Sequence, residues 1–235
     1  MGLLCAQCFA ELEGNVVMAD INLDVLKERA EEINQKGKGK AIAVECDVRN
    51  YEQVTAVCDA AVKNFGSIDL LVNSAGGAEL RMNGIRGDNE FPDTPIEVFD
   101  WGIDVNLKGQ FYFAHAAMKQ MREQKSGVII NFGSISGEEG CEFNVAYSAS
   151  KSAAMNGFTR SLARYGSRYG IRCCCVSPGP VLTRPGMAAL KTALGRDAEP
   201  QEIVDMILYL ASDKGSFITG INILMDGGRN IMSRC

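Results

Sequence analysis

Short apolar runs alternate with stretches of helical periodicity along most of the chain. The apolar runs predict buried strands at residues 15–19, 41–45, 68–73, 128–132, 171–177 and 222–225. Apolar positions at helical spacing predict helices over residues 23–35, 51–65, 96–124, 147–169 and 200–212. Strands that are apolar throughout and separated by helices indicate a parallel sheet covered on both faces. We therefore predict one doubly wound α/β domain over residues 1–235, in three α/β/α layers, with ligands at the carboxyl ends of its strands.

Two longer irregular stretches interrupt the alternation. They cover residues 76–95, which are rich in Gly, Asn and Asp, and residues 178–199. Each follows a predicted strand at the edge where ligands gather, so we interpret both as ligand-facing loops rather than plain surface connections. The second stretch predicts an open site or a small lid helix over residues 186–194.

The composition is that of a globular protein. The 235 residues are 46% apolar and 23% charged, and the net charge of −5 argues against a broad nucleic-acid-binding surface. No apolar run reaches the ~20 residues that cross a bilayer, and the N-terminal stretch lacks the pattern of a secretory signal. We therefore expect a cytoplasmic protein without nucleic-acid or membrane partners.

Nine cysteines and one histidine limit the metal and disulfide chemistry. Cys173, Cys174 and Cys175 lie in an apolar run, where neighbouring side chains point to opposite faces of a strand, so we interpret them as small buried hydrophobes. Cys5 and Cys8 match C-x-x-C, but the redox form of this motif follows a strand. Packing is therefore the preferred interpretation of this pair, redox chemistry is the alternative, and no metal site is expected.

The segment AYSASK carries the first candidate chemistry. It places Tyr147 and Lys151 four residues apart, on one face of a helix. A phenol has a pKa of about 10, and a neighbouring ammonium lowers that pKa by favouring the phenolate. Lys151 therefore makes Tyr147 a candidate acid/base. The alternative is an unrelated pair of neighbours on an exposed helix face.

Two further polar residues support this assignment. Ser134, in NFGSISG, follows a predicted strand, so its hydroxyl and that of Tyr147 can converge on one carbonyl oxygen; the alternative is a loop serine that caps a turn. Asn106, in DVNLKG, lies inside a predicted helix, where an amide is a poor helix former. A buried Asn106 needs partners and can hold a water beside Lys151; the alternative is an amide that faces solvent.

The set resembles the short-chain dehydrogenase/reductase family. Four residues match, in order and approximate spacing, that family's catalytic tetrad: Asn106, Ser134, Tyr147 and Lys151. Three segments are similar to its N-N-A-G motif, its nicotinamide-lining P-G segment, and its C-terminal strand and turn: NSAG (73–76), SPGPVLT (177–183) and ITGINILMDGG (218–228). The resemblance covers nearly the whole chain and implies a Rossmann-like fold.

The resemblance also implies a reaction, hydride transfer between NAD(H) and a secondary alcohol or ketone. Tyr147 would exchange the hydroxyl proton, Ser134 would fix and polarise the oxygen, and Lys151 would tune Tyr147 and bind the nicotinamide ribose. Asn106 would anchor the proton relay. The residues implied to contact the cofactor are Gly2, Asp20, Asp47, Val48, Asn73, Ala75, Gly76, Tyr147, Lys151, Pro178, Gly179, Val181 and Thr183. A catalytically silent relative, or a truncated form unable to bind the dinucleotide, is the alternative.

The choice between NAD and NADP depends on Asp20. This residue ends the first predicted strand, where a carboxylate accepts both hydroxyls of the adenosine ribose and repels a 2′-phosphate. NAD is therefore preferred over NADP, although a strand-end Asp is also a common helix cap. Asp47 and Val48 resemble the family's adenine contacts, and a turn-forming Asp47 is the alternative.

The opening segment MGLLCAQCFAELEG resembles the second half of the family's phosphate-binding unit, T-G-x-x-x-G-x-G, with Gly2 at its last glycine. The family's first strand, the Thr and two glycines have no counterpart in the printed sequence. That strand is central in the order 3-2-1-4-5-6. We therefore expect an incomplete pyrophosphate cradle and a sheet whose gap closes, is filled by another segment or leaves part of the chain disordered, so that this chain does not form the complete family fold as a stable monomer.

Substrate and assembly are less sharply indicated. Cys141, Phe143 and Asn144 lie just before the candidate tyrosine and are expected to edge the pocket, with Phe143 as an apolar wall. The helices predicted over residues 96–124 and 147–169 carry apolar stripes wider than one sheet face requires. Such helices form dimer contacts within tetramers in the family, so a homotetramer or homodimer is expected; the alternative is that both are simply core helices.

Overall fold

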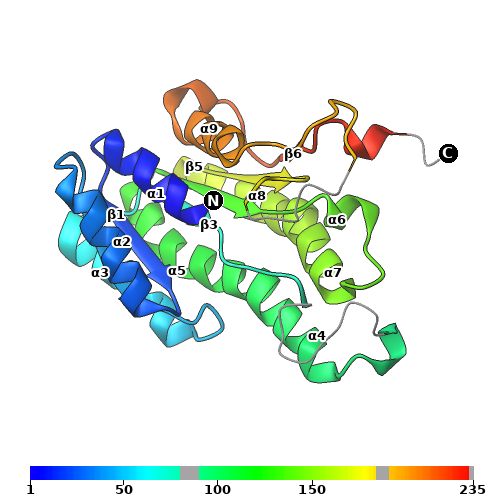
Figure 1. The fold of residues 1–235 in the computed structure, drawn as a ribbon. Coiled ribbons are helices and arrows are strands. Elements are labelled where there is room, and N and C mark those ends of the chain that lie inside the picture. Colours follow the sequence, from blue (N-terminus) through cyan, green and yellow to red (C-terminus); the bar gives the residue numbers. More distant parts are fainter. Residues whose placement is uncertain (80–89, 184–190, 233–235) are drawn as a thin grey trace.

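The computed structural model describes residues 1–79, 90–183 and 191–232. Parallel strands lie between two layers of helices (Figure 1). One face is covered by α1 (Gly2–Glu11), α2 (Leu23–Gln35) and α9 (Pro200–Ala211). The other face is covered by α3 (Tyr51–Phe65), α5 (Gly109–Gln124) and α8 (Thr159–Gly166). The predicted three-layer α/β/α class is confirmed.

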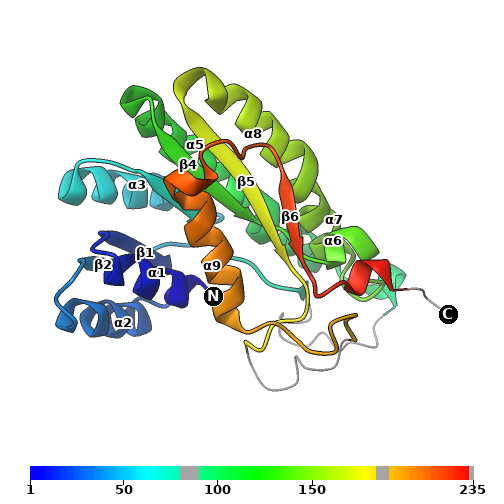
Figure 2. The same ribbon diagram turned by 90° about the horizontal axis from the view of Figure 1, so that it is seen from above.

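Every predicted apolar run forms a strand. Within the described ranges the strands are β1 (Val16–Asp20), β2 (Ala41–Glu45), β3 (Leu70–Asn73), β4 (Gly127–Phe132), β5 (Ile171–Pro178) and β6 (Asn222–Met225). All of their pairings are parallel. The central strands β4 and β5 are buried on both faces, which explains why they are apolar along most of their length (Figure 2).

The cysteine run in β5 shows this two-sided burial directly. Cys173 packs into the core on the α5 side of the sheet, and Cys174 packs into the core on the α9 side. Cys175 is also fully buried. The interpretation of these residues as buried hydrophobes on alternating faces is therefore confirmed.

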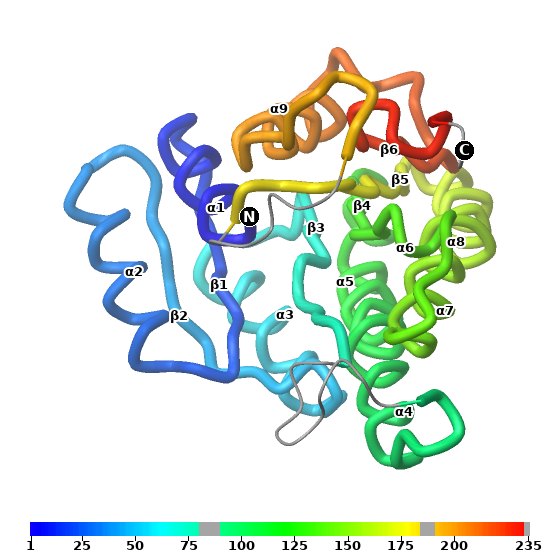
Figure 3. The backbone as a smooth tube through the Cα atoms, turned by 45° about the vertical axis from the view of Figure 1, so that its right-hand side comes forward, coloured from blue at the N-terminus to red at the C-terminus, as the bar shows by residue number. Residues whose placement is uncertain are grey.

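The strands form two sheets rather than one. β1 pairs only with β2, and the order of the larger sheet is β3-β4-β5-β6. Figure 3 shows β1 and β2 standing apart from β3, with α1 lying near the division. The expected gap is thus present, and within the described chain it is neither closed by pairing of β1 with β3 nor filled by another strand.

Side chains join the two sheets in place of backbone hydrogen bonds. On α1, Cys5 packs into the core of the larger sheet, whereas Ala6 and Ala10 pack into the small core formed with α2, β1 and β2. On the opposite face, Val17 and Ala19 of β1 pack against the core that α5 shares with the larger sheet. The helices therefore hold the two sheets in one three-layer arrangement.

Two predicted helices are interrupted. The stretch predicted at 96–124 consists of α4 (Ile96–Ile103), a π-helical segment η3 (Asp104–Lys108) and α5. The amide of Asn106 donates to the carbonyl of Gly102, four residues earlier, and so occupies an acceptor that a regular helix needs. An extra residue is accommodated there, as is common for π-bulges at functional sites.

The second long helix is interrupted in the same way. It consists of α7 (Val145–Ala153), a π-helical segment η4 (Ala154–Phe158), α8 and a short 3₁₀ turn, η5 (Ser167–Tyr169). The Thr159 hydroxyl donates to the carbonyl of Ala154. The short helix α6 (Ser136–Glu139) was not predicted, because four residues carry no periodicity. The predicted lid helix at 186–194 lies largely outside the described residues.

Three further 3₁₀ turns complete the described elements: η2 (Phe91–Asp93), η6 (Asp213–Gly215) and η7 (Arg229–Ile231). Over the described ranges, the helices all fall short of the length and apolarity that a membrane span requires.

Candidate functional site

The four catalytic candidates lie on segments that meet beyond the carboxyl ends of β3, β4 and β5. Ser134 stands two residues after β4, and Tyr147 and Lys151 lie on α7. Asn106 lies in the π-helical segment η3, which packs against α7. The topology therefore brings all four segments to the edge that the sequence predicts as the ligand side.

Asn106 is fully buried and clamps the loop after β3. Its Oδ1 accepts from the N–H of Gly77 at 2.9 Å, and its Nδ2 donates to the carbonyls of Gly77 at 2.8 Å and Gly102 at 2.9 Å. Both amide hydrogens are used within the protein, and the water beside Lys151 stays a prediction. The solvent-facing alternative is wrong, because Asn106 is buried and fixes the backbone at Gly77, directly after the NSAG segment.

Lys151 is buried beside that loop. Its Nζ donates to the carbonyl of Phe132 at 2.9 Å and lies 5.6 Å from the centre of the Tyr147 ring. A Cβ placed on Gly76 would come within 3.3 Å of this Nζ and 2.6 Å of Asn106 Oδ1. Burial lowers the pKa of Lys151 from its ordinary value to about 8. The Lys151 ammonium therefore lies close to the Tyr147 ring and to the backbone of Gly76, where a larger residue than glycine would not fit.

Ser134 has the turn-capping role that the sequence named as its alternative, and its predicted role at a substrate oxygen stays open. Ser134 is 7% exposed, and its Oγ accepts from the N–H of Ser136 at 3.1 Å, which caps the turn into α6. The hydroxyl hydrogen is not needed for this cap and can serve a substrate oxygen. α6 sits directly on α7, since a Cβ on Gly137 would come within 2.8 Å of the Ser152 nitrogen. The serine loop is thus fixed to the helix that carries Tyr147 and Lys151.

The residues expected at the nicotinamide end occupy two neighbouring loops. Asn73 is buried, and its Nδ2 donates to Asn131 Oδ1 at 2.9 Å across β3 and β4. Ala75 and Gly76 follow on the exposed side of the loop. The carbonyl of Pro178 accepts from the N–H of Ile135 at 2.9 Å, which joins the end of β5 to the Ser134 loop.

The remainder of the P-G segment turns away from β5. A Cβ on Gly179 would come within 2.6 Å of the Asp226 backbone, so only glycine fits there. Val181 is 2% exposed and packs into the core on the α9 side, and Thr183 is exposed. Val181 thus anchors this loop, while Thr183 stays accessible at the ligand edge.

The residues expected at the adenosine end lie on the small sheet. Asp20 is exposed at the end of β1, and its Oδ1 accepts from the N–H of Asn22 at 3.0 Å. Asp47, just beyond β2, binds Arg49 through both carboxylate oxygens, and that hydrogen-bonded guanidinium holds the pKa of Asp47 below its ordinary value. Val48 packs against Gly109, where a Cβ would come within 2.7 Å of its side chain. Asp47 therefore also has the turn role named as its alternative.

Gly2 lies at the start of α1, against the NSAG loop. A Cβ on Gly2 would come within 2.7 Å of Ser74 Oγ. The first turn of α1, whose amides have no partner within the helix, therefore faces the loop that follows β3. This placement agrees with a site for an anion at the helix N-terminus.

Two buried residues of this site were not predicted. Gln110 is 2% exposed and donates to the carbonyls of Asn106 at 2.7 Å and Phe132 at 3.2 Å, so it shares an acceptor with Lys151. Glu79 is 6% exposed and accepts from two N–H groups at the start of α7. The spacing of four residues from Asn106 could have indicated Gln110. No periodic signal marks Glu79, which lies in an irregular stretch.

Cys5 and Cys8, the two cysteines of the C-x-x-C motif, lie in different environments. Cys5 is buried, and burial raises the pKa of its thiol to about 11, which favours packing over redox chemistry. Cys8 contacts the Gln201 side chain. Within the described ranges, no group of three His, Cys, Asp or Glu side chains could hold a metal ion.

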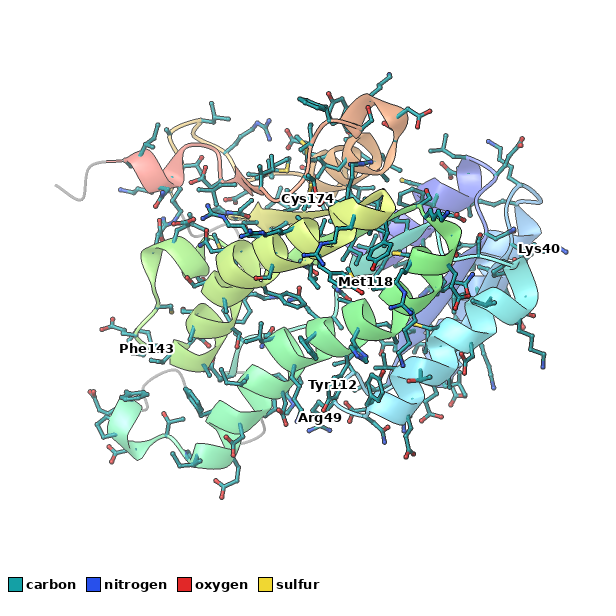
Figure 4. All side chains as sticks on the ribbon, turned by 180° about the vertical axis from the view of Figure 1, so that it is seen from behind. Lys40, Arg49, Tyr112, Met118, Phe143 and Cys174 are labelled. Carbon is teal, nitrogen blue, oxygen red and sulfur yellow. The ribbon has the colours of Figure 1, made fainter. Side chains whose placement is uncertain are left out.

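The segment before Tyr147, which was predicted to edge the pocket, is partly accessible to solvent. Phe143 is 50% exposed at one end of the molecule, where Figure 4 labels it. Cys141 and Asn144 are partly buried, with Asn144 Nδ2 lying 3.4 Å from Cys141 Sγ. Phe143 therefore offers an apolar surface, and its two neighbours stabilise the turn.

The parallel strands between two helical layers define a Rossmann-like α/β fold, with the candidate residues at the carboxyl ends of the strands, and the comparisons with known proteins agree. The family model described as "Enoyl-(Acyl carrier protein) reductase" matches residues 1–230. The chain belongs to the short-chain dehydrogenase/reductase family of oxidoreductases.

Two relatives of known activity by name and one solved structure support this membership. A trans-4-hydroxycyclohexanecarboxylate dehydrogenase from Sinomonas cyclohexanicum is 41% identical over 97% of this chain and 88% of its own length. An NAD-dependent glycerol dehydrogenase from Listeria innocua is 32% identical over 98% of this chain and 90% of its own. The crystal structure of a 3-oxoacyl-[acyl-carrier protein] reductase with bound NAD from Brucella melitensis superimposes with a TM-score of 0.86 at 32% identity, covering 97% of this chain and 86% of that one.

Proposed function

We propose that the protein transfers a hydride between NAD(H) and a secondary alcohol or ketone. The observation that carries the proposal is the buried ammonium of Lys151 against the Tyr147 ring, on a helix fixed to the Ser134 loop. A structural role alone does not explain a buried lysine that forms no ion pair within the described ranges, because the burial of a charge is costly. An acid/base role for a tyrosine does explain it, because that tyrosine needs a cationic neighbour.

The residues present fit a nicotinamide cofactor. The exposed backbone of Ala75 and Gly76 stands at the carboxyl end of β3, and a side chain at position 76 would collide with Asn106 and approach Lys151. A glycine held this close to an ammonium suits the approach of a ribose hydroxyl. The bound cofactor would supply the hydride-accepting ring, with Asn73, Pro178 and the neighbouring loops as its walls.

The chain's own residues would then manage the proton. Lys151, with a pKa of about 8, is largely protonated at neutral pH, and its charge would favour the phenolate form of Tyr147. Tyr147 would take the proton from the substrate hydroxyl, and the Ser134 hydroxyl would donate to the same oxygen as it becomes a carbonyl. Asn106 would contribute by holding the loop at Gly77.

The named relatives supply the substrates to test. We take trans-4-hydroxycyclohexanecarboxylate, a ring alcohol, as the first substrate to test, since the relative named for it is 41% identical to this chain. Glycerol and a 3-oxoacyl thioester complete the panel. The assay records NADH formation or consumption by the purified chain, beside calorimetric titration with NAD. Binding of NAD without turnover of any panel member would contradict this substrate class, and absence of NAD binding would favour the catalytically silent alternative.

NAD is proposed over NADP because of Asp20, and a charge-removing variant tests this. In Asp20→Asn the amide oxygen can still accept from Asn22, while repulsion of a 2′-phosphate is lost. We expect the preference for NAD, measured as the ratio of kcat/KM values, to fall by about tenfold, which corresponds to ~1.4 kcal/mol. Glu45→Gln, at the paired position of β2, is the control. An unchanged ratio in Asp20→Asn would show that this carboxylate does not discriminate between the ribose of NAD and the 2′-phosphate of NADP.

A homotetramer or homodimer is proposed through the face that α5 and α8 share (Figure 4). Phe111 on α5 is 51% exposed and stacks on His115, and its ring lies 6.0 Å from that of Phe158. Exposed aromatic side chains on α5, packed against the partly buried Phe158 of η4, are typical of an interface core. Light scattering after size exclusion is expected to give an oligomer for the wild type and a smaller species for Phe111→Glu. A monomeric wild type would contradict the proposal.

A reducing compartment such as the cytoplasm is the proposed location. The cysteines of the described chain are all free thiols, and most of them are buried.

A further inference from the structure

We propose that Glu79 is a positioning residue for the reaction, because its carboxyl group caps α7 and fixes the backbone of Tyr147. Glu79 Oε1 accepts from the N–H of Ala146 at 2.6 Å and from the N–H of Tyr147 itself at 3.1 Å. These are the second and third residues of α7, whose N–H groups have no partner inside the helix. The inference rests on the proposed acid/base role of Tyr147.

The cap comes from a distant part of the chain because the local one is lacking. Asn144 precedes α7 at the position where an Asn side chain normally caps, yet it makes no such hydrogen bond. Its Nδ2 lies instead beside Cys141 Sγ at 3.4 Å. Glu79, 67 residues before Ala146, takes over the function from the loop that follows β3. A tertiary contact therefore sets where the first turn of the catalytic helix lies.

Close packing holds the Glu79 side chain in place. A Cβ on Gly102 of α4 would come within 3.3 Å of Glu79 Cγ and 2.9 Å of Ala146 Cβ. The carboxyl group thus reaches α7 through a space that exists only because residue 102 has no side chain. Glu79 Oε2 is buried and makes no hydrogen bond within the described chain. The two N–H groups of α7 are therefore what offsets the burial of this carboxyl group.

The same loop is held at a second point, only two residues earlier. Asn106 binds both the N–H and the carbonyl of Gly77, and Glu79 binds α7. The loop proposed to face the nicotinamide and the helix proposed to move the proton are thereby fixed to each other. Hydride and proton transfer need the nicotinamide and the Tyr147 hydroxyl to be correctly placed relative to each other. A shift of ~1 Å at Tyr147 is therefore expected to lower the rate by up to ~10²-fold.

The chain offers a matched control for the loss of a cap. Asn50 Oδ1 accepts from the N–H groups of Glu52 and Gln53, the second and third residues of α3. Asn50→Ala therefore removes the same kind of cap, from a helix that carries no catalytic candidate. We expect Glu79→Ala to lower kcat by about tenfold or more with KM for NAD within about twofold, and Asn50→Ala to leave kcat within about twofold.

Rescue separates positioning from simple loss of stability. Glu79→Gln keeps an oxygen at the same distance and is expected to retain kcat within about threefold, whereas Glu79→Asp, one methylene shorter, is expected to lose most of it. Equal kcat in Glu79→Ala and the wild type would overturn the inference. So would Glu79→Gln being as slow as Glu79→Ala. If Glu79→Ala does not fold, the comparison of Glu79→Gln with Glu79→Asp decides, and equal activity of these two overturns the inference.

Amide hydrogen exchange tests the cap without any turnover. Exchange at Ala146 and Tyr147 is expected to be about tenfold faster in Glu79→Ala than in the wild type and unchanged in Glu79→Gln. Unchanged exchange in Glu79→Ala overturns the cap itself. Failure of the proposed reaction is recognised separately, by a wild type that turns over none of the panel substrates or by a Tyr147→Phe variant that is fully active.

Discussion

Replacing Tyr147 by Phe is expected to lower kcat by about 10²–10⁴-fold while the affinity for NAD stays within about twofold. The substitution removes one oxygen and keeps the ring that lies 5.6 Å from Lys151 Nζ, so packing against α7 and the buried ammonium is retained. What is lost is the group that would exchange the substrate proton. Steady-state kinetics with the substrate that the wild type turns over, together with an NAD titration, measures both quantities.

Tyr209→Phe is the matched control, since Tyr209 is 44% exposed and lies on α9 rather than on α7. Its kcat should equal that of the wild type. A Tyr147→Phe variant with wild-type kcat would show that the phenol is not the acid/base. A variant that has also lost NAD binding would show that the phenol acts mainly in holding the cofactor.

Replacing Lys151 by Met is expected to abolish activity and at the same time to stabilise the fold. The pKa of Lys151 is about 8 in the folded protein, against ~10.4 in an unfolded chain, because burial penalises the ammonium. Below pH ~8 the full penalty opposes folding, and it amounts to ~3 kcal/mol for a shift of this size. Met fills similar space without a charge, and Phe132 keeps Gln110 as a donor to its carbonyl at 3.2 Å.

The pH dependence identifies the cause of the stabilisation. Between pH ~8 and ~10.4 the unfolded chain binds more protons than the folded protein, so the free energy of unfolding of the wild type rises with pH in this window. The advantage of Lys151→Met should therefore be largest at pH 7 and vanish above pH ~10.4. Urea unfolding at both ends of the window measures it. A constant difference across this range, or a less stable variant at pH 7, would contradict the assigned burial cost.

The sequence alone predicts the strands and most helices, because β4 and β5 are buried on both faces and are apolar along most of their length. The π-helical segments could not be predicted, since one extra residue barely disturbs the apolar spacing of α4 and α5. They arise from side-chain hydrogen bonds such as that of Asn106 to Gly102. The gap in the sheet was expected, but its outcome depends on whether α1 packs well across it, which is a property of the folded cores.

In the site, too, the sequence predicts which residues are candidates but does not predict their hydrogen-bond partners. The identity of Asn106, Ser134, Tyr147 and Lys151 as candidates came from their order and spacing. Their hydrogen-bond partners could not be predicted, because they depend on tertiary contacts: Asn106 binds Gly77, and Glu79 reaches α7 from 67 residues away. A cap between distant segments leaves no local pattern, so such positioning residues become visible only in the fold.

The division of the strands into two sheets gives the proposed cofactor a mechanical role. Asp20 and Asp47 stand on the small sheet, whereas Gly76 and Lys151 belong to the large one, and no ladder of the described chain joins them. A dinucleotide bound at both ends would link the two sheets, which within the described chain contact each other through side chains rather than through strand pairing. Dinucleotide binding would restrict the motion of one sheet relative to the other, which costs entropy. The measured affinity would therefore depend on this entropy loss as well as on the contacts at each end of the dinucleotide.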